Sequence, residues 1–181
     1  MNADRGRESD VIAHIGAAAI EIGRLLTEQR LLLATAESCT AGGIAYAVTQ
    51  VAGASEWFER GFITYSNESK QQVLGVSPLY LRDFGAVSEP VARAMALGAL
   101  THSRAHITVA VTGVAGPSGG TPEKPVGTVC LAWAIKRDPA AAPWAKTQTL
   151  HLAGDRAAVR TQSIIAALDG LLALLRHRLD V

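Results

Sequence analysis

Residues 31–43, LLLATAESCTAGG, decide the fold that this sequence predicts. Apolar residues open the stretch and indicate a short buried strand, after which small polar residues make a tight turn. Two glycines, Gly42 and Gly43, then lead into an amphipathic run that is typical of a helix. A strand that runs into a helix N-terminus directs backbone N–H groups at one point, which suits an anion or a developing oxyanion. We therefore expect a strand–turn–helix unit whose turn is a candidate functional site.

The hydroxyl of Ser38 in this turn is a candidate nucleophile. An alternative interpretation is that Ser38 or Thr40 only caps the helix that follows, because Ser and Thr are preferred N-caps. Cys39 is a rival nucleophile, but a thiol without an identified histidine partner is more often a small buried residue. This segment alone leaves the choice between capping and catalysis open.

The composition is that of one globular domain: the chain has 181 residues, 49% of them hydrophobic and 18% charged, with a formal net charge of +1. We expect a flexible tail over residues 1–10 and a single domain over residues 11–181. Lys and Arg are scattered, so no nucleic-acid partner is expected.

The same sequence predicts a cytoplasmic protein without a membrane partner. Every apolar run is shorter than the roughly 18–20 residues that cross a bilayer, and the polar N-terminus has no signal-peptide pattern. Two cysteines and five scattered histidines show no metal-ligand spacing, so we expect neither a metal nor another cofactor.

Helical periodicity alternates with β-branched runs along the chain. Helices are expected at 11–29, 41–51, 68–74, 78–84, 88–104 and from 156 onward, and strands at 31–36, 61–65, 106–112, 129–135 and 147–152. We expect Asn67 and Asp155 to cap the helices that follow them, and the short linker at 138–143 to join the last two strands as an antiparallel hairpin. This alternation predicts an α/β fold, a three-layer α/β/α sandwich with a mixed, mostly parallel sheet of about five strands.

In open α/β sheets, ligands bind outside the carboxyl ends of the strands. Three turns with hydroxyl side chains leave those ends here: the Ser38 turn, the turn at 65–66, and Thr112 with the loop behind it. The order of elements predicts that the three turns converge on one site.

A serine nucleophile needs a base, and the nearest basic side chain in these turns is Lys70. A lysine acts as a base when burial or the positive end of its helix lowers its pKa from about 10.4 toward neutrality. Tyr65, just upstream, is expected to hydrogen-bond Lys70 or Ser38 and to relay a proton. A solvated helix lysine and a strand-end aromatic ring are the alternatives, and spacing alone does not decide between them.

Residues 113–127, GVAGPSGGTPEKPVG, form a long loop with five glycines and three prolines, and such loops in compact domains are usually functional. The loop is neither GxGxxG nor a Walker A sequence, yet its glycines let backbone N–H groups approach an anion such as phosphate. Lys124 and Arg156 are further cations for the same anion. A purely structural loop is the alternative.

Four motifs together resemble the CinA C-terminal domain family: AESCTAG at 36–42, YSNESK at 65–70, GAVSE at 85–89 and TGVAGPSGGTPEKPVG at 112–127. The resemblance runs from about residue 15 to about residue 175. Ala41 and Ser118 depart from the family, in which glycine is common at both positions. Larger members carry an additional N-terminal domain that resembles molybdopterin-binding proteins, so the resemblance implies the stand-alone form.

Enzymatic members of that family are nicotinamide-nucleotide amidases, which convert nicotinamide mononucleotide to nicotinic acid mononucleotide and ammonia in bacterial pyridine-nucleotide recycling. The resemblance implies a catalytic set of Ser38 as nucleophile with Lys70 and Tyr65 as its base system. Backbone N–H groups of residues 38–43 would hold the oxyanion. The residues expected to bind the substrate are Thr40, Gly42, Asn67, Thr112, Gly113, Gly116, Gly119 and Arg156.

The expected partners are a small nucleotide substrate and a second copy of the chain in a homodimer. The apolar face of the first helix would pack on the sheet or on that second subunit. The alternative function is a non-catalytic nucleotide-binding or interaction module of the same family, linked to competence or DNA damage.

Overall fold

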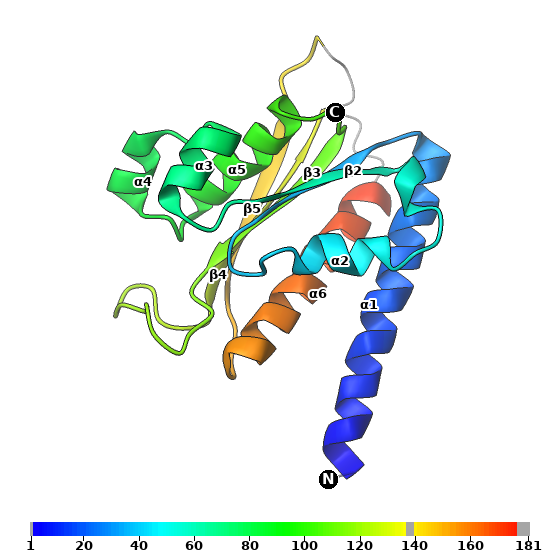
Figure 1. Ribbon diagram of the computed structural model, residues 1–181, viewed down its shortest axis with the longest axis horizontal. Helices are drawn as coiled ribbons and strands as arrows, with labels where there is room; N and C mark the ends of the chain where they lie inside the picture. The colour runs from blue at the N-terminus through cyan, green and yellow to red at the C-terminus, as the bar shows by residue number, and fades with distance from the viewer. Residues whose placement is uncertain (1, 137–139, 177–181) are drawn as a thin grey trace.

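A computed structural model of the protein describes residues 2–136 and 140–176, which form a five-stranded sheet between two helical layers (Figure 1). The strands are β1 (Leu33–Glu37), β2 (Phe58–Ile63), β3 (Ile107–Gly113), β4 (Thr128–Ile135) and β5 (Trp144–His151). Their order across the sheet is β2-β1-β3-β4-β5. The strand β1 pairs in parallel with β2 and β3, while β4 runs antiparallel to β3 and β5. The predicted mixed α/β sheet is confirmed.

Helices cover both faces of the sheet (Figure 1). On one face lie α1 (Asn2–Gln29), α2 (Gly43–Thr49) and α6 (Arg156–Arg176), and on the other α3 (Asn67–Leu74), α4 (Pro78–Phe84) and α5 (Glu89–Thr101). A single 3₁₀ turn, η1 (Ala54–Glu56), precedes β2.

The two faces of the sheet differ in the size of their side chains. Toward α1, α2 and α6 the strands present large apolar residues such as Leu33, Leu131 and Trp133. Toward α5 they present mainly alanines, including Ala36 and Ala110, so this helix lies close to the sheet. Alternation along each strand therefore buries both faces, as a sheet between two layers requires.

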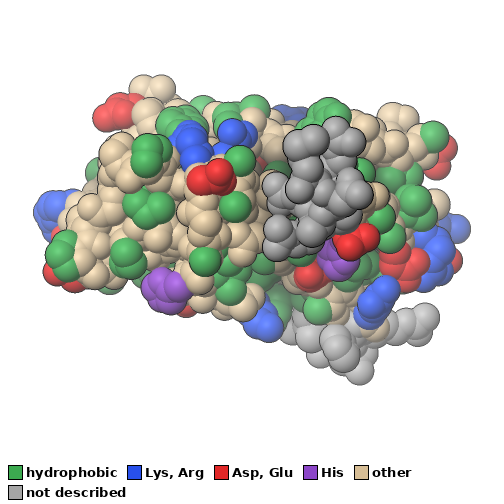
Figure 2. Space-filling model, turned by 90° about the horizontal axis from the view of Figure 1, so that it is seen from below, with side chains coloured by type: hydrophobic (Ala, Val, Ile, Leu, Met, Phe, Trp, Pro, Cys, Tyr) green, Lys and Arg blue, Asp and Glu red, His purple; other side chains and the backbone are tan. Residues whose placement is uncertain are grey.

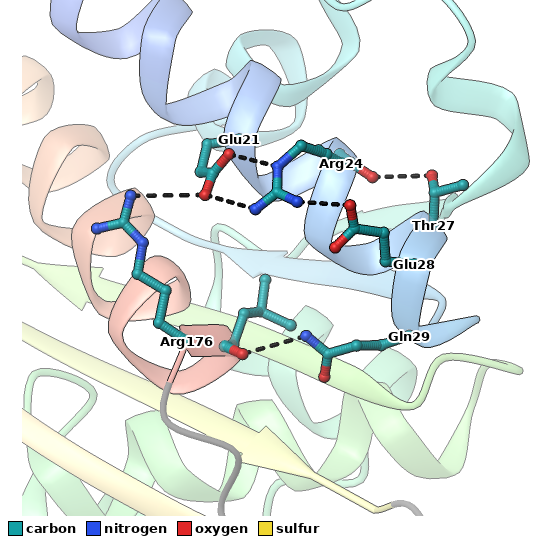
Figure 3. Close-up of polar contacts among 8 residues, drawn as sticks. Glu21, Arg24, Thr27, Glu28, Gln29 and Arg176 are labelled. Carbon is teal, nitrogen blue, oxygen red and sulfur yellow. Dashed lines mark hydrogen bonds and ion pairs between the residues drawn. The ribbon is translucent and has the colours of Figure 1, made fainter.

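Polar contacts reinforce the packing of α1 against α6 (Figure 3). Arg176 lies 3.7 Å from the Glu21 carboxylate, and Gln29 donates a hydrogen bond to the Leu175 carbonyl at 3.1 Å. Arg24 links Glu21 to Glu28 on α1 itself. These contacts anchor the C-terminal part of α1 on the domain.

The helix α6 is, within the described ranges, the one helix long and apolar enough to cross a membrane by length and composition. In that window 44% is buried inside the domain, and its apolar face belongs to the core. Core helices of globular domains pass the same test. On the face seen in Figure 2, basic and acidic side chains are interspersed without an extended patch of one sign.

Two local predictions were wrong. The first helix begins at Asn2 instead of residue 11, so residues 2–10, expected as a tail, continue α1. No proline interrupts this segment, and helix propagation from turns already formed is far easier than nucleation. Ser66, and not Asn67, caps α3, because the Ser66 hydroxyl accepts a hydrogen bond from the Ser69 N–H at 3.0 Å. Asn67 becomes the first helical residue.

The register of the sheet brings together the carboxyl ends of its three parallel strands, β1, β2 and β3. Glu37, the last residue of β1, pairs with Ile63 of β2 and with Val111 of β3. The turns that follow these strands therefore start side by side.

Candidate active site

The three turns line one cavity of about 180 Å³ at this edge of the sheet. Its walls are Ser38, Cys39, Tyr65, Asn67, Lys70, Ala86, Val87, Thr112, Gly113, Ala115 and Arg156. The convergence predicted from the order of elements is confirmed, because residues from the turns after β1 and β2, from the end of β3 and from α3 and α6 meet here.

Lys70 contacts Ser38 inside this cavity. The Lys70 Nζ lies 3.1 Å from the Ser38 Oγ, and the lysine side chain is only 1% exposed. It extends from the first turn of α3 back under the helix N-terminus, where it donates hydrogen bonds to the carbonyls of Thr64 at 2.9 Å and Tyr65 at 3.2 Å. These carbonyl contacts hold the amine at the serine hydroxyl.

Burial lowers the pKa of the Lys70 amine from its ordinary 10.5, and the nearby Glu68 carboxylate and Cys39 side chain oppose that shift only in part. A lowered pKa increases the fraction of neutral amine, whose lone pair can accept the Ser38 proton. The two N–H groups of a neutral amine suffice for the carbonyls of Thr64 and Tyr65, which leaves its lone pair for the Ser38 hydroxyl. The pair has the geometry of a nucleophile and its base.

Cys39 is a poor nucleophile in this site. Burial raises the pKa of its thiol to about 11, so the thiol is protonated at neutral pH. Of the two rival nucleophiles, the geometry and the protonation state both favour Ser38.

The phenol of Tyr65 does not make the expected hydrogen bond to Lys70 or Ser38 among the described residues. Its hydroxyl accepts a hydrogen bond from the Arg156 Nη2 at 3.0 Å, and its ring is 57% exposed at the cavity mouth. Only the backbone carbonyl of Tyr65 reaches the Lys70 amine. The side chain turns outward after β2, toward the N-terminal turn of α6, where Arg156 begins that helix.

A buried carboxylate, which sequence reasoning had not singled out, organises the turn after β1. Glu37 is fully buried and accepts four hydrogen bonds. Its donors are the Thr40 hydroxyl at 2.6 Å and the N–H groups of Gly42 at 3.0 Å, Ile44 at 3.0 Å and Ala45 at 2.8 Å. Glu37 thus satisfies the N-terminal donors of α2, and neither Ser38 nor Thr40 caps this helix.

This network corrects the expected oxyanion site. Of the six N–H groups in residues 38–43, four donate within the domain, namely those of Ser38, Ala41, Gly42 and Gly43. Two consecutive left-handed residues, Ala41 (φ 51°) and Gly42 (φ 92°), fold the chain back so that its donors face Glu37. The N–H groups of Cys39 and Thr40 donate to no other residue among those described, and of these two residues Cys39 lines the cavity.

The other expected substrate-binding residues fall into two groups. Asn67, Thr112, Gly113 and Arg156 line the cavity, although the Thr112 hydroxyl already donates to the Ala86 carbonyl at 2.9 Å. Thr40, Gly42, Gly116 and Gly119 are not among its walls. The hydroxyl of Thr40 and the N–H of Gly42 are bonded to Glu37, which the local sequence did not reveal.

The glycine loop at 113–127 contacts the site through Arg156. The Gly116 carbonyl accepts a hydrogen bond from the Arg156 Nη1 at 2.9 Å. A Cβ on Gly113 would lie 2.8 Å from the Val129 Cγ2, so this cavity wall requires glycine. Lys124, expected to face the same anion, donates instead to the Phe84 carbonyl at the end of α4.

A second cation, Arg160, was also missed. It follows Arg156 by one helical turn of α6, and its Nη2 donates to the Thr40 carbonyl at 2.9 Å. Spacing of four residues on one helix was the available signal, because it places both side chains on the same face. In the described part of the chain, no three His, Cys, Asp or Glu side chains gather as a metal site.

Comparison with known proteins identifies the family of this chain. The CinA C-terminal domain family matches residues 16–175. The chain is 50% identical to the nicotinamide-nucleotide amidohydrolase PncC of Pseudomonas putida, over 88% of this chain and 96% of that protein. It is 48% identical to the protein of the same name from Escherichia coli K12, over 83% of this chain and 88% of that one.

Other relatives are longer. A CinA-like protein of Chlorobium luteolum is 46% identical over 97% of this chain, which spans only 41% of that relative's length. Among solved structures, the competence/damage inducible protein CihA from Agrobacterium tumefaciens superposes with a TM-score of 0.85 at 42% identity, over 91% of this chain and 96% of that one.

Proposed function

The chain belongs to the CinA C-terminal domain family, and we propose that it is a nicotinamide-nucleotide amidase that converts nicotinamide mononucleotide to nicotinic acid mononucleotide and ammonia. The observation that carries this proposal is the 3.1 Å contact between the Lys70 Nζ and the Ser38 Oγ in a cavity. About half of the aligned residues are identical to those of relatives named nicotinamide-nucleotide amidohydrolase, which supports the choice of substrate.

The reaction is acyl transfer to serine. The Ser38 Oγ attacks the carboxamide carbon while the Lys70 amine takes the hydroxyl proton. The tetrahedral intermediate collapses as ammonia leaves with a proton returned from Lys70. Water then attacks the acyl carbon and gives its proton to the same amine, and as the ester C–O bond breaks that proton passes to the Ser38 Oγ and the carboxylate product leaves. One lysine thus serves as base and acid in both halves.

The dimensions of the cavity suggest how a nucleotide is held. At about 180 Å³ it is smaller than the roughly 300 Å³ of typical ligand pockets, so it takes the pyridine carboxamide and leaves the ribose phosphate at its mouth. Arg156 lies at this mouth. It donates one hydrogen bond to Tyr65 and one to Gly116, and its guanidinium has further N–H groups that can donate to a ligand. A guanidinium held in this way suits a phosphate.

We place the enzyme in the cytoplasm, in the recycling of pyridine nucleotides, and we propose that it acts as a homodimer. Ile12 and Ile20, on the outer face of α1, are large exposed apolar side chains, which supports an interface there. Light scattering after size-exclusion chromatography tests this: an Ile12→Glu/Ile20→Glu variant should elute as a monomer if the wild type is a dimer.

Ammonia release tests the function. The wild-type protein should release ammonia from nicotinamide mononucleotide faster than from nicotinamide riboside or NAD, whereas Ser38→Ala should not release it while staying folded. Ser55→Ala, at an exposed serine in η1, is the matched control and should keep full turnover. A folded Ser38→Ala protein with wild-type turnover would refute the assignment. Nucleotide binding without ammonia release would support the non-catalytic module instead.

A further inference from the structure

Arg160 is a charged side chain at this end of the sheet that neither lines the cavity nor pairs with a carboxylate of the described residues. The side chain is half-buried. Its Nη2 donates a hydrogen bond to the Thr40 carbonyl, and its Nε is buried without an acceptor in the described part of the chain. An unpaired buried N–H destabilises a fold, so packing alone does not account for an arginine here.

The contact of Arg160 completes a set of bonds that immobilises Thr40. The Thr40 carbonyl also accepts from the Gly43 N–H at 3.1 Å, and the Thr40 hydroxyl donates to Glu37. The next residue, Ala41, is held in the left-handed region, which is unfavourable for a residue with a side chain. Strain of this kind persists only where neighbouring contacts over-determine the backbone.

Cys39 lies between two residues that are fixed in this way. On one side the Ser38 N–H donates to the Val111 carbonyl at 3.0 Å, and on the other the Thr40 carbonyl is held by Arg160. The Cys39 N–H donates to no other residue in the described part of the chain, and Cys39 forms part of the cavity wall directly after the serine. A free backbone donor adjacent to a nucleophile is the group that stabilises a developing oxyanion.

We propose that Arg160 is a positioning residue: by holding the Thr40 carbonyl it fixes the Cys39 N–H toward the oxyanion that forms when Ser38 attacks its substrate. The identity of the substrate rests on the proposed amidase function. The role of Arg160 rests on the hydrogen bonds around Thr40 and extends to any acyl compound that reacts at Ser38.

Steady-state kinetics give the first test. Arg160→Gln should lower kcat about 10- to 100-fold, the range seen when a supporting hydrogen bond behind a catalytic group is lost, and should leave KM within about threefold. Arg160→Lys should recover part of the loss, because its ammonium can still donate to the Thr40 carbonyl. Arg176→Gln, an exposed arginine at the far end of α6, is the matched control and should keep wild-type kinetics.

A boronic acid gives a second readout that does not depend on amide turnover. With 3-pyridylboronic acid, a B–O bond forms between the boron and the Ser38 Oγ, the hydroxyl proton passes to Lys70, and the boron becomes a tetrahedral anion. One of its oxygens then occupies the oxyanion position. Boron-11 NMR and competition binding should show that Arg160→Gln weakens this adduct by the same factor as kcat, while binding of planar nicotinic acid mononucleotide is unchanged.

The outcomes separate the proposals. Unchanged kcat and adduct affinity in Arg160→Gln would overturn the role of Arg160. A rise in KM alone would also overturn it, as would an equal loss of affinity for 3-pyridylboronic acid and for nicotinic acid mononucleotide. If circular dichroism shows that Arg160→Gln does not fold, the Arg160→Lys variant is measured instead. Wild-type kcat and wild-type adduct affinity in Arg160→Lys would then overturn the role. If the wild type forms an Arg160-dependent adduct but does not release ammonia from nicotinamide mononucleotide, the substrate assignment fails and the positioning role stands. No adduct in the wild type overturns the positioning role.

Discussion

The turns after β1 and β2 leave neighbouring parallel strands, and each buries a charge of opposite sign. In the turn after β1, the carboxylate of Glu37 accepts four hydrogen bonds, all from its own turn and helix. In the turn after β2, the hydrogen-bond partners of the Lys70 ammonium among the described residues are backbone carbonyls and the hydroxyl of Ser38. One charge is matched within its turn, and the other faces the cavity.

This difference separates a structural charge from a reactive one. Glu37 accepts from four donors, three of them at the positive end of α2, so the group organises the backbone of its own turn. Burial lowers the pKa of Lys70, which leaves the amine able to exchange a proton with its neighbour. Burial alone therefore does not mark a catalytic group, whereas incomplete compensation of its charge does.

The largest effect is expected when the reactive charge is removed. Lys70→Met should lower kcat about 10²- to 10⁴-fold, the usual contribution of a general base, and Lys70→Arg should do the same because guanidinium does not deprotonate. Ammonia release from nicotinamide mononucleotide measures the loss. Lys146→Met, at an exposed lysine of β5, is the control. Retention of activity in Lys70→Arg would show that the lysine is only an electrostatic partner.

Removing the charge of Glu37, which is compensated within its own turn, should act mainly on stability. Glu37→Gln has one carbonyl oxygen in place of two charged ones and turns an amide N–H₂ toward backbone donors. We expect a loss of about 1.5–3 kcal/mol in the free energy of unfolding, the range for hydrogen bonds to charged groups. Urea denaturation measures it against Glu56→Gln, an exposed glutamate in η1. Equal midpoints for the two variants would contradict the structural role of Glu37.

The pH dependence of stability tests the lowered pKa of Lys70. The folded-state pKa of Lys70 is lowered, so between that pKa and the ordinary 10.5 the unfolded chain binds more protons than the folded one. The free energy of unfolding of the wild type, relative to Lys70→Met, should therefore rise with pH across this window. Below it the difference should be constant. Denaturation curves from pH 6 to pH 10, within the range where the fold persists, provide the measurement, and a falling difference would contradict the lowered pKa.

The smallest effect is expected at Tyr65. Tyr65→Phe removes a hydrogen bond to Arg156 and leaves the carbonyl contact with Lys70 in place. A loss of about 2- to 10-fold in kcat/KM follows from one ordinary hydrogen bond, chiefly through KM. Michaelis kinetics separate the two parameters. A fall in kcat as large as that of Lys70→Met would show that the phenol relays the proton after all.

Much of the fold and part of the site were predictable from local patterns. The β-branched run in β3 and the apolar residues before Ser38 identified strands, and the order of elements predicted which turns converge. The contact between Lys70 and Ser38 followed from that convergence. Partners of individual groups did not follow, because Glu37 could take the Gly42 donor only after the turn had closed.

The chain by itself determined which segments become strands and helices and which turns meet, because periodicity and turn residues act within a few positions. Only the tertiary structure decided which hydrogen-bond partner each polar group takes. In the tertiary structure the Tyr65 phenol is hydrogen-bonded to Arg156, the Thr40 carbonyl to Arg160 and the Ser38 hydroxyl to Lys70. These partners are 32 to 120 residues apart in sequence, and a hydrogen bond needs two atoms within about 3 Å, which only packing of distant elements achieves.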